Sequence, residues 1–231
     1  MSVIDAKSVL QSPIKGFSRG RAVCLFSGGI DSPVALWLTI KAGIVPVAVY
    51  FDSYPLSDQR AREIALQGIR KVREYAEAPP IRTYVVGHSI DASEIISSCQ
   101  RNLACVISRR MMFRVASEIA RREGADAIAT GDVVGQKASQ TLHNIFATDS
   151  AADGLTIMRP LVGMNKDEIE RLARSIGTFL ISIRPGVAAC GIPTRKPRTH
   201  SRPEEITESE SKLNLDHMVK RALDHAEILE L

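Results

Sequence analysis

The sequence has few aromatic residues, few cysteines and no long apolar run, and each shortage excludes a class of protein. Aromatic residues make up only 5% of the 231 positions, so base stacking cannot dominate any binding to nucleic acid. None of the four cysteines forms a Cys-x-x-Cys pair, which argues against a secreted disulfide framework. The start of the chain carries no apolar signal region, and no run reaches membrane-spanning length. We therefore expect a cytoplasmic protein without a membrane partner.

The composition suits one large domain, alone or with an appendage. Hydrophobic residues account for 45% of the chain, and the formal net charge is +4, which is compatible with a nucleic-acid partner but not diagnostic of one. Residues 1–20 lack periodicity and predict an N-terminal arm. Residues 21–185 predict the main domain. Residues 186–231 predict a basic, cysteine-bearing loop and an amphipathic helix up to Leu229, which packs on its own domain or contacts a second copy.

Apolar runs of strand length alternate with segments of helical periodicity through the main domain. The runs are 21–26, 44–51, 82–86, 127–130 and 156–159, and the helical segments are 33–41, 57–77, 89–98, 103–122, 139–146 and 165–176. This alternation predicts an α/β fold, a parallel sheet with helices on both faces. Ligands of such sheets bind beyond the carboxyl ends of the strands.

A glycine turn, Ser-Gly-Gly-Ile-Asp-Ser at 27–32, follows the first predicted strand and precedes a helix. This arrangement points backbone N–H groups and a helix N-terminus at an anion. Gly28 and Gly29 allow positive φ and close approach of a phosphate, and Ser27 and Ser32 add hydroxyl donors. The turn has neither the lysine of a Walker A loop nor the spacing of a dinucleotide fingerprint. It resembles the PP-loop of the ATP pyrophosphatases, which implies an adenine nucleotide alpha hydrolase-like fold.

A second polar motif, Thr-Gly-Asp-Val-Val-Gly-Gln-Lys-Ala-Ser-Gln-Thr at 130–141, follows the fourth predicted strand. Asp132 is a candidate ligand of Mg²⁺ on nucleotide phosphates, because hard cations prefer carboxylate oxygens. The polar side chains after it are hydrogen-bonding groups at the start of a helix, although ordinary helix caps look the same.

Together the two motifs resemble the catalytic domain of the ThiI family, the tRNA 4-thiouridine synthetases. Shorter matches lie at 51–55, 109–113, 159–161, 167 and 190, so the resemblance covers about 170 residues. It implies an ATP-dependent, AMP-forming sulfurtransferase. Such an enzyme adenylates the O4 of a tRNA uridine, replaces it by sulfur and releases AMP and pyrophosphate. The implied cofactors are ATP and Mg²⁺, and the implied partners are tRNA and a persulfide sulfur donor.

The resemblance gives roles to residues of both motifs and their neighbours. The nucleotide-binding residues would be Ser27, Gly28, Gly29, Asp31, Ser32, Tyr50, Phe51, Gly131, Gln136, Gln140 and Lys166. Asp31 and Asp132 would hold Mg²⁺, and Asp132 would take part in catalysis. The RNA substrate would contact Arg109, Arg110, Arg195 and Lys196. For Arg109 and Arg110, a solvated helix face remains an open alternative. For Arg195 and Lys196, the alternative is a solvated loop.

Two cysteines are candidate catalytic residues. The family cysteine at the place of Cys190 carries the persulfide sulfur or attacks it, and Cys105 then looks like its resolving partner, forming a disulfide as sulfur leaves. Nearby basic residues would favour the Cys190 thiolate. The alternative for Cys190 is an incidental cysteine in a loop. The alternative for Cys105 is a cysteine at the start of a helix that packs in the core. Cys24 and Cys99 read as small buried hydrophobes.

The sequence also departs from the family pattern. Nothing before Arg21 matches the THUMP region that docks tRNA, and no rhodanese domain is present, so we expect a separate THUMP-bearing partner or a dimer mate to help bind tRNA. Ser108 replaces the second cysteine that some members use for an iron–sulfur cluster. Three other functions stay open: thiolation of a different tRNA position, amidation or thiolation of a small molecule, and a non-catalytic ATP-binding subunit of a split synthetase.

Overall fold

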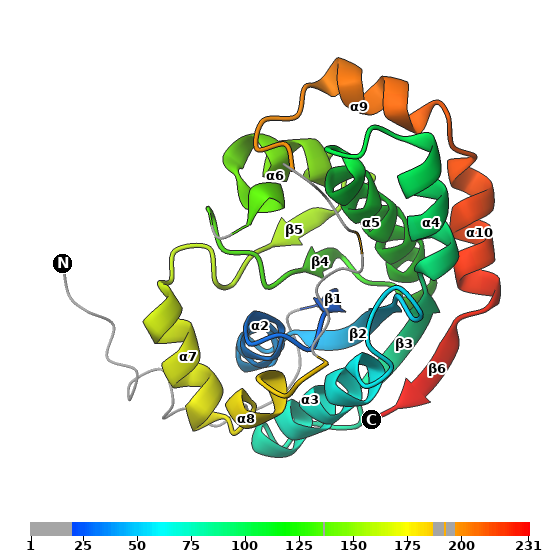
Figure 1. The fold of residues 1–231 in the computed structure, drawn as a ribbon. Coiled ribbons are helices and arrows are strands. Elements are labelled where there is room, and N and C mark those ends of the chain that lie inside the picture. The colour runs from blue at the N-terminus through cyan, green and yellow to red at the C-terminus, as the bar shows by residue number, and fades with distance from the viewer. Residues whose placement is uncertain (1–19, 136, 187–191, 193–196) are drawn as a thin grey trace.

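The structure, a computed structural model, describes residues 20–135, 137–186, 192 and 197–231. Within these residues the strands form one sheet in the order β5-β4-β1-β2-β3-β6 (Figure 1). Neighbouring strands are parallel except β6, which runs antiparallel to β3. The strands are β1 (Arg21–Phe26), β2 (Val45–Asp52), β3 (Arg82–Gly87), β4 (Ala127–Ala129), β5 (Thr156–Met158) and β6 (Glu227–Glu230). The predicted α/β class is confirmed, and the sheet is parallel as predicted apart from the antiparallel edge strand β6.

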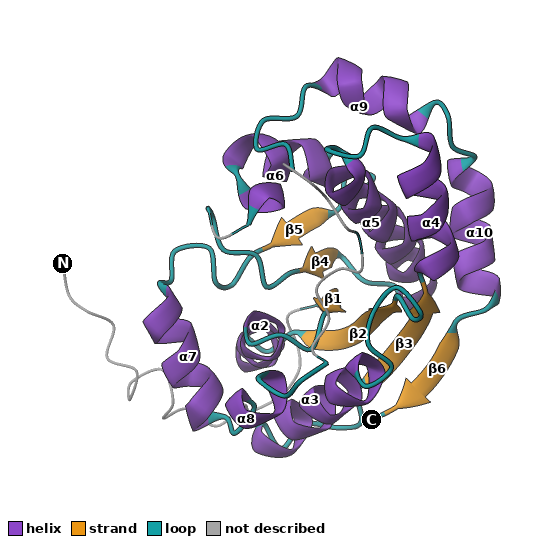
Figure 2. Cartoon of the chain, viewed as in Figure 1, coloured by secondary structure: helices purple, strands orange, loops and turns teal. Residues whose placement is uncertain are grey.

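Helices cover both faces of this sheet (Figure 2). One face carries α2 (Asp31–Lys41), α3 (Ala61–Tyr75), α7 (Lys166–Ser175) and α8 (Phe179–Ser182). The other carries α4 (Ser89–Ser98), α5 (Ala104–Glu123), α6 (Leu142–Asp149), α9 (Pro203–Glu210) and α10 (Leu215–Asp224). Alternate residues of a strand point to opposite faces, so Val23 packs under the α5 layer and Cys24 under the α2 layer. None of the helices in the described part of the chain is long and apolar enough to span a bilayer.

Local sequence signals explain several helix boundaries. The Asn165-Lys-Asp-Glu168 pattern predicts a capping box, and the structure has one at the start of α7. The long helix α5 ends at Gly124, whose φ of 61° suits a residue without a side chain. The predicted helix over 139–146 is divided instead: a short 3-10 turn η1 (Ala138–Gln140) precedes α6, with Thr141 as the cap between them.

The C-terminal end differs from the sequence prediction. The helix expected to run to Leu229 is wrong beyond Asp224, because Glu227–Glu230 forms β6 on the edge of β3. The strand has only four residues, a run too short for helical and strand periodicities to be told apart. α9 and α10 bury Ile206 and Met218 in the same core as α5. The part of the 186–231 segment that the structure describes therefore packs into the main domain rather than beside it.

Candidate functional site

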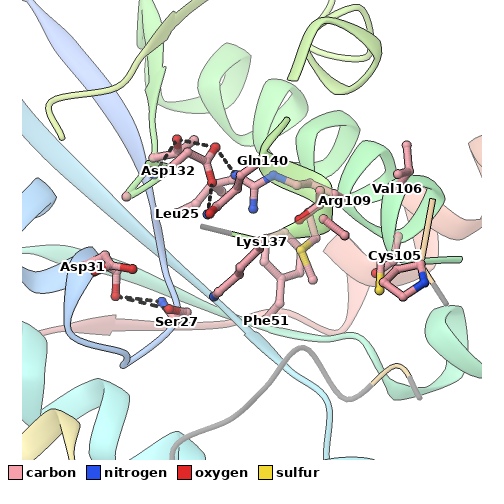
Figure 3. Close-up of a pocket in the computed structure, with 18 of the residues that line it drawn as sticks. Leu25, Ser27, Asp31, Phe51, Cys105, Val106, Arg109, Asp132, Lys137 and Gln140 are labelled. Carbon is pink, nitrogen blue, oxygen red and sulfur yellow. Dashed lines mark hydrogen bonds and ion pairs between the residues drawn. The ribbon is translucent and has the colours of Figure 1, made fainter. Parts of the chain in front are cut away.

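A pocket of about 340 Å³ lies at the carboxyl edge of the sheet. The ends of β1, β2 and β4, the start of α2, the first half of α5, η1 and residues 197–198 supply its lining. In Figure 3, Ser27 and Asp31 lie at one end of this space, Cys105 lies at the other, and Arg109 and Lys137 lie between them. The pocket therefore brings together the two sequence motifs and one of the two candidate cysteines.

The glycine turn is stabilised by its own two serines. The backbone N–H of Ser27 donates to Ser32 Oγ at 3.1 Å, and Ser32 Oγ in turn lies 3.4 Å from the carbonyl of Gly29. Gly28 has a φ of +77°, and a Cβ there would lie 3.3 Å from the Cα of Ala65 in α3. Gly29 is not among the described glycines with positive φ. The turn therefore requires glycine at Gly28, whereas the expected positive φ is not found at Gly29, where a Cβ would make an ordinary 3.5 Å contact with Ser27 Oγ.

The two motifs touch at Gly131. A Cβ at this position would lie 3.1 Å from the backbone of Asp31 and Ser32, so only glycine lets the end of β4 approach the start of α2 so closely. Asp31 is half-buried, and burial raises the pKa of its carboxyl, while Lys137 lowers it. Among the described residues, no group donates a hydrogen bond to the Asp31 carboxylate.

Asp132 is the best-connected side chain of the pocket. Its side chain is buried, and the carboxylate accepts hydrogen bonds from Arg109, from Thr130 Oγ1 at 2.8 Å and from Gln140 Nε2 at 3.1 Å. Arg159 Nε lies 3.6 Å away. Burial alone would raise the pKa of Asp132, but the two guanidinium groups and the hydrogen bonds more than offset it, so the pKa is lowered. Asp132 is therefore an anion that already has its counterions.

These contacts decide how well the predicted magnesium ligands fit. Asp31 fits, because its carboxylate faces the pocket and accepts from none of the described donors. Asp132 does not fit in this arrangement, because a cation would have to displace Arg109, Thr130 or Gln140. Within the described residues no group of three or more His, Cys, Asp or Glu side chains is placed to hold a metal ion. We therefore retain Asp31 alone as a candidate ligand of Mg²⁺.

The base of the pocket comes from β2 and α5. Tyr50 is 2% exposed, and its hydroxyl has no hydrogen-bond partner in the described part of the chain. Phe51 lines the pocket with its ring against His88 at a centroid distance of 5.6 Å. Cys105, half-buried, lines the pocket one helical turn before Arg109. As neighbours in β2 the two side chains point to opposite faces of the sheet, Tyr50 into the core under α2 and Phe51 against the core under α5, so the flat apolar surface that this strand offers a ligand is the ring of Phe51.

The remaining candidates separate into three groups. Gly131 and Gln140 lie in the pocket wall as expected. Lys166 does not; its side chain is 76% exposed at the start of α7 and lies 3.8 Å from Glu170. Its charge nevertheless lowers the pKa of Asp31, after burial, Lys137 and Asp132 in size of effect. Gln136, Cys190, Arg195 and Lys196 lie outside the described residues.

Arg110 needs a correction. It is buried, and its guanidinium makes two hydrogen bonds to Glu210 of α9, at 2.7 and 2.9 Å, and others to Ala147 O and Ser150. It leaves α5 about 100° around the helix from the pocket-lining Arg109 and does not line the pocket. The structure gives Arg110 a packing role, and we do not carry it into the proposed substrate contacts. Cys24 is buried, as expected, and burial raises the pKa of its thiol to about 12.

Sequence reasoning missed several residues of the pocket wall. They are Asn102, Ser108, Met112 and Lys137; Pro197 and Arg198, which belong to the basic stretch 195–202, line the pocket as well. Ser108 shares a 2.7 Å hydrogen bond with His88, a ring that is 1% exposed. Burial lowers the pKa of His88 to about 4, so the ring is neutral. A lone buried histidine has no spacing signal, whereas Lys137 lies inside the second motif and Arg198 inside the basic stretch at 195–202.

The glycine turn at the end of β1, the parallel sheet and the pocket beyond its carboxyl edge define an α/β domain of the PP-loop class. A family model described as "Thiamine biosynthesis protein (ThiI)" matches residues 17–215. The chain belongs to the ThiI family.

Relatives at the sequence level agree. Probable tRNA sulfurtransferases of Acetivibrio thermocellus and Halothermothrix orenii are 39% and 40% identical, over 215 and 218 residues. Each alignment covers 93% of this chain and 54% of the relative. The chain thus spans about half the length of the curated relatives that it matches.

Two solved structures have a similar fold. A 4-thiouridine synthetase in complex with RNA and bound ATP matches with a TM-score of 0.85 and 35% identity, over 91% of this chain and 55% of that one. An NMN synthetase from Francisella tularensis matches with a TM-score of 0.56 and 16% identity, over 95% and 94% of the two chains. The second likeness concerns the fold alone.

Proposed function

We propose that this chain is the catalytic part of an ATP-dependent tRNA sulfurtransferase that makes 4-thiouridine, at position 8 of tRNA as in its family. The observation that carries the proposal is one pocket with Ser27 and Asp31 at one end and Cys105 at the other. The first end is built for phosphate, and the second brings a thiol to the far side of the same space. The likeness to a synthetase with bound ATP and RNA supports this assignment.

The phosphate end would bind ATP. The N–H groups of the 27–32 turn and the N-terminus of α2 would hold the β- and γ-phosphates, with Tyr50 and Phe51 beside the adenosine. Mg²⁺ bound at Asp31 would neutralise charge on the phosphates. Arg109 and Lys137 lie between the two ends of the pocket, where they would stabilise charge on the α-phosphate.

The reaction then has two displacements. The O4 of the uridine attacks the α-phosphorus, a P–O bond to the β-phosphate breaks, and pyrophosphate leaves. A sulfur nucleophile then attacks C4 of the adenylated uracil, the C4–O bond breaks, and AMP leaves with the former O4. N3 loses its proton when O4 is adenylated and takes up a proton again in 4-thiouridine, while the sulfur nucleophile gives up its own.

Sulfur would reach C4 from a persulfide on Cys190, supplied by an external persulfide donor. Cys105 would attack the inner sulfur as the terminal sulfur bonds to C4, leaving a Cys105–Cys190 disulfide, two oxidised thiols that a reductant must restore. A THUMP-bearing partner or a dimer mate would help to hold the tRNA.

Nucleoside analysis of tRNA tests the substrate assignment. We expect tRNA from cells lacking the protein to have lost 4-thiouridine and to regain it when the gene returns. Intact 4-thiouridine with a different nucleoside missing would contradict the assignment.

Nucleotide products test the activation step. With α-labelled ATP and tRNA, the protein should yield AMP and pyrophosphate, because the turn has no Walker lysine to support cleavage at the γ-phosphate. Asp31→Asn should nearly abolish turnover and leave the circular dichroism spectrum unchanged. ADP as the sole nucleotide product would contradict the proposal.

A further inference from the structure

Asn144, in the first turn of α6, is a fully buried amide whose side chain reaches outside its own helix. Nδ2 donates to the carbonyls of Ala138 and Arg198, at 2.7 and 2.8 Å, and Oδ1 accepts from the backbone N–H of Ser201 at 3.0 Å. The two carbonyls need a donor and the N–H needs an acceptor, so only one orientation of the amide satisfies all three. No shorter or apolar side chain can replace it there.

The two backbone segments held by this amide both line the pocket. Ala138 begins η1, which also supplies Gln140 as a hydrogen-bond donor to Asp132. Arg198 lies in the wall with Pro197, and its own N–H donates to Asn102 O at 3.0 Å in the loop before α5. Asn144 therefore ties the segment 197–201 to η1 across the start of α6.

The two segments depend on Asn144 to different extents. η1 keeps other bonds, from Gly135 N–H to Gln140 O at 2.9 Å and from Gln140 Nε2 to Asp132. In the 197–201 segment, Arg198 O and Ser201 N have Asn144 as their one partner among the described residues, although Thr141 Oγ1 also donates to Thr199 O at 2.6 Å and the rings of His143 and His200 stack. The phosphate-facing turn at 27–32 makes none of its described hydrogen bonds to either segment.

We infer that Asn144 is a positioning residue, which holds the wall at Pro197 and Arg198 at a fixed place for the acceptor RNA. This inference rests on the proposed function and deepens it. Loss of the amide leaves the phosphate end of the pocket intact and loosens the opposing wall, so it weakens use of the RNA more than binding of ATP.

Three variants test this. Asn144→Ala removes all three hydrogen bonds. Asn144→Asp keeps the shape and the acceptor for Ser201 but places a carboxylate against two carbonyls. Asn214→Ala is the matched control, because Asn214 caps α10 through His217 N–H, away from the pocket.

For Asn144→Ala we expect backbone amides of 198–201 to exchange hydrogen at least tenfold faster. The Kd for ATP should change less than threefold, and kcat/KM for RNA thiolation should fall at least tenfold, mainly through KM. Asn144→Asp should show the same split. Asn214→Ala should lower Tm and leave kcat/KM for RNA unchanged.

An equal loss of ATP affinity and RNA turnover in both Asn144 variants would overturn the inference, because it would mark a structural role alone. Unchanged exchange at 198–201 would also overturn it. If neither variant folds, hydrogen exchange of the wild-type protein provides the test. The Ser201 amide must then exchange as slowly as the amides of β1. Fast exchange of that amide would refute the hydrogen bond from Ser201 to Asn144 and with it the inference. The exchange and ATP measurements do not need thiolation, so they remain decisive if the proposed function fails.

Discussion

The guanidinium of Arg109 donates to the carboxylate of Asp132, joining α5 to the loop after β4 across the pocket. The Asp132 side chain is 4% exposed and that of Arg109 is 22% exposed, so solvent screens the pair little. Arg159 approaches the same carboxylate from the end of β5. One anion thus holds two cations, and one of them, Arg109, faces the space between the phosphate end and Cys105.

Asp132→Asn should destabilise the protein and inactivate it together. The change removes the carboxylate to which Arg109 donates, while Arg159 keeps its ion pair with Asp149, and breaking a buried pair costs roughly 3 kcal/mol. Urea unfolding measures the loss. Asp153→Asn is the control. The Asp153 side chain is 67% exposed, so its ion pair with Arg121 should contribute less than about 1 kcal/mol to the free energy of unfolding. Equal urea midpoints for the two variants would contradict a stabilising role for the ion pairs of Asp132.

Gly131→Ala should reduce ATP binding by displacing the start of α2. The new Cβ would lie 3.1 Å from backbone atoms of Asp31 and Ser32, which cannot move away as a side chain can. Such overpacking costs about 1–3 kcal/mol. Isothermal titration with ATP should show weaker binding. Gly163→Ala meets nothing within 4 Å, so binding by that variant should equal wild type. Full ATP affinity in Gly131→Ala would refute the contact.

Stability should fall as pH drops from 7 to 5 because of His88. Burial lowers its pKa to about 4, below the value of about 6.5 in an unfolded chain. The folded state therefore favours the neutral ring, and its contribution is complete above pH 6.5 and is lost progressively toward pH 4. At pH 5 the loss is about 2 kcal/mol. Urea unfolding at several pH values measures this. The free energy of unfolding should depend less steeply on pH in His88→Gln than in the wild-type protein. Parallel profiles would contradict this.

Cys190→Ser should stop sulfur transfer and leave ATP cleavage to AMP in place. The resolving role of Cys105 requires that the wild-type protein carry a Cys105–Cys190 disulfide after one turnover without reductant. Peptide mass mapping detects this disulfide. Cys99→Ser is the control, because Cys99 is buried against Ser209 O, 3.4 Å away, outside the pocket. Thiolation by Cys190→Ser at the wild-type rate with a persulfide donor would show that sulfur arrives by a different route.

The parts that could be predicted from the sequence are those with a local signal. The alternation of apolar runs and helical segments predicts the parallel sheet, and the glycine turn predicts the phosphate end of the pocket, since both patterns follow from short-range geometry. The strand β6 could not be predicted, because four residues after a helix carry both periodicities.

Long-range partners of charged residues could not be predicted either. Arg109 and Arg110 are adjacent in the sequence, yet one faces the pocket and the other is buried against Glu210, 100 residues away. Lys166 looked like a phosphate ligand and lies exposed beside Glu170. The sequence predicts Asp132 as a metal ligand, yet its carboxylate accepts from Arg109 of α5 and lies near Arg159 at the end of β5.

The most direct test of the account follows the oxygen of the target uridine. The protein is given tRNA with ¹⁸O at O4 of uridine 8, ATP, Mg²⁺ and a persulfide donor, with a tRNA-binding partner added if turnover requires it, and the AMP is analysed by mass spectrometry. Because O4 attacks the α-phosphorus and stays on it when sulfur displaces AMP, one ¹⁸O should appear in AMP for each 4-thiouridine formed. Unlabelled AMP alongside 4-thiouridine would contradict the account.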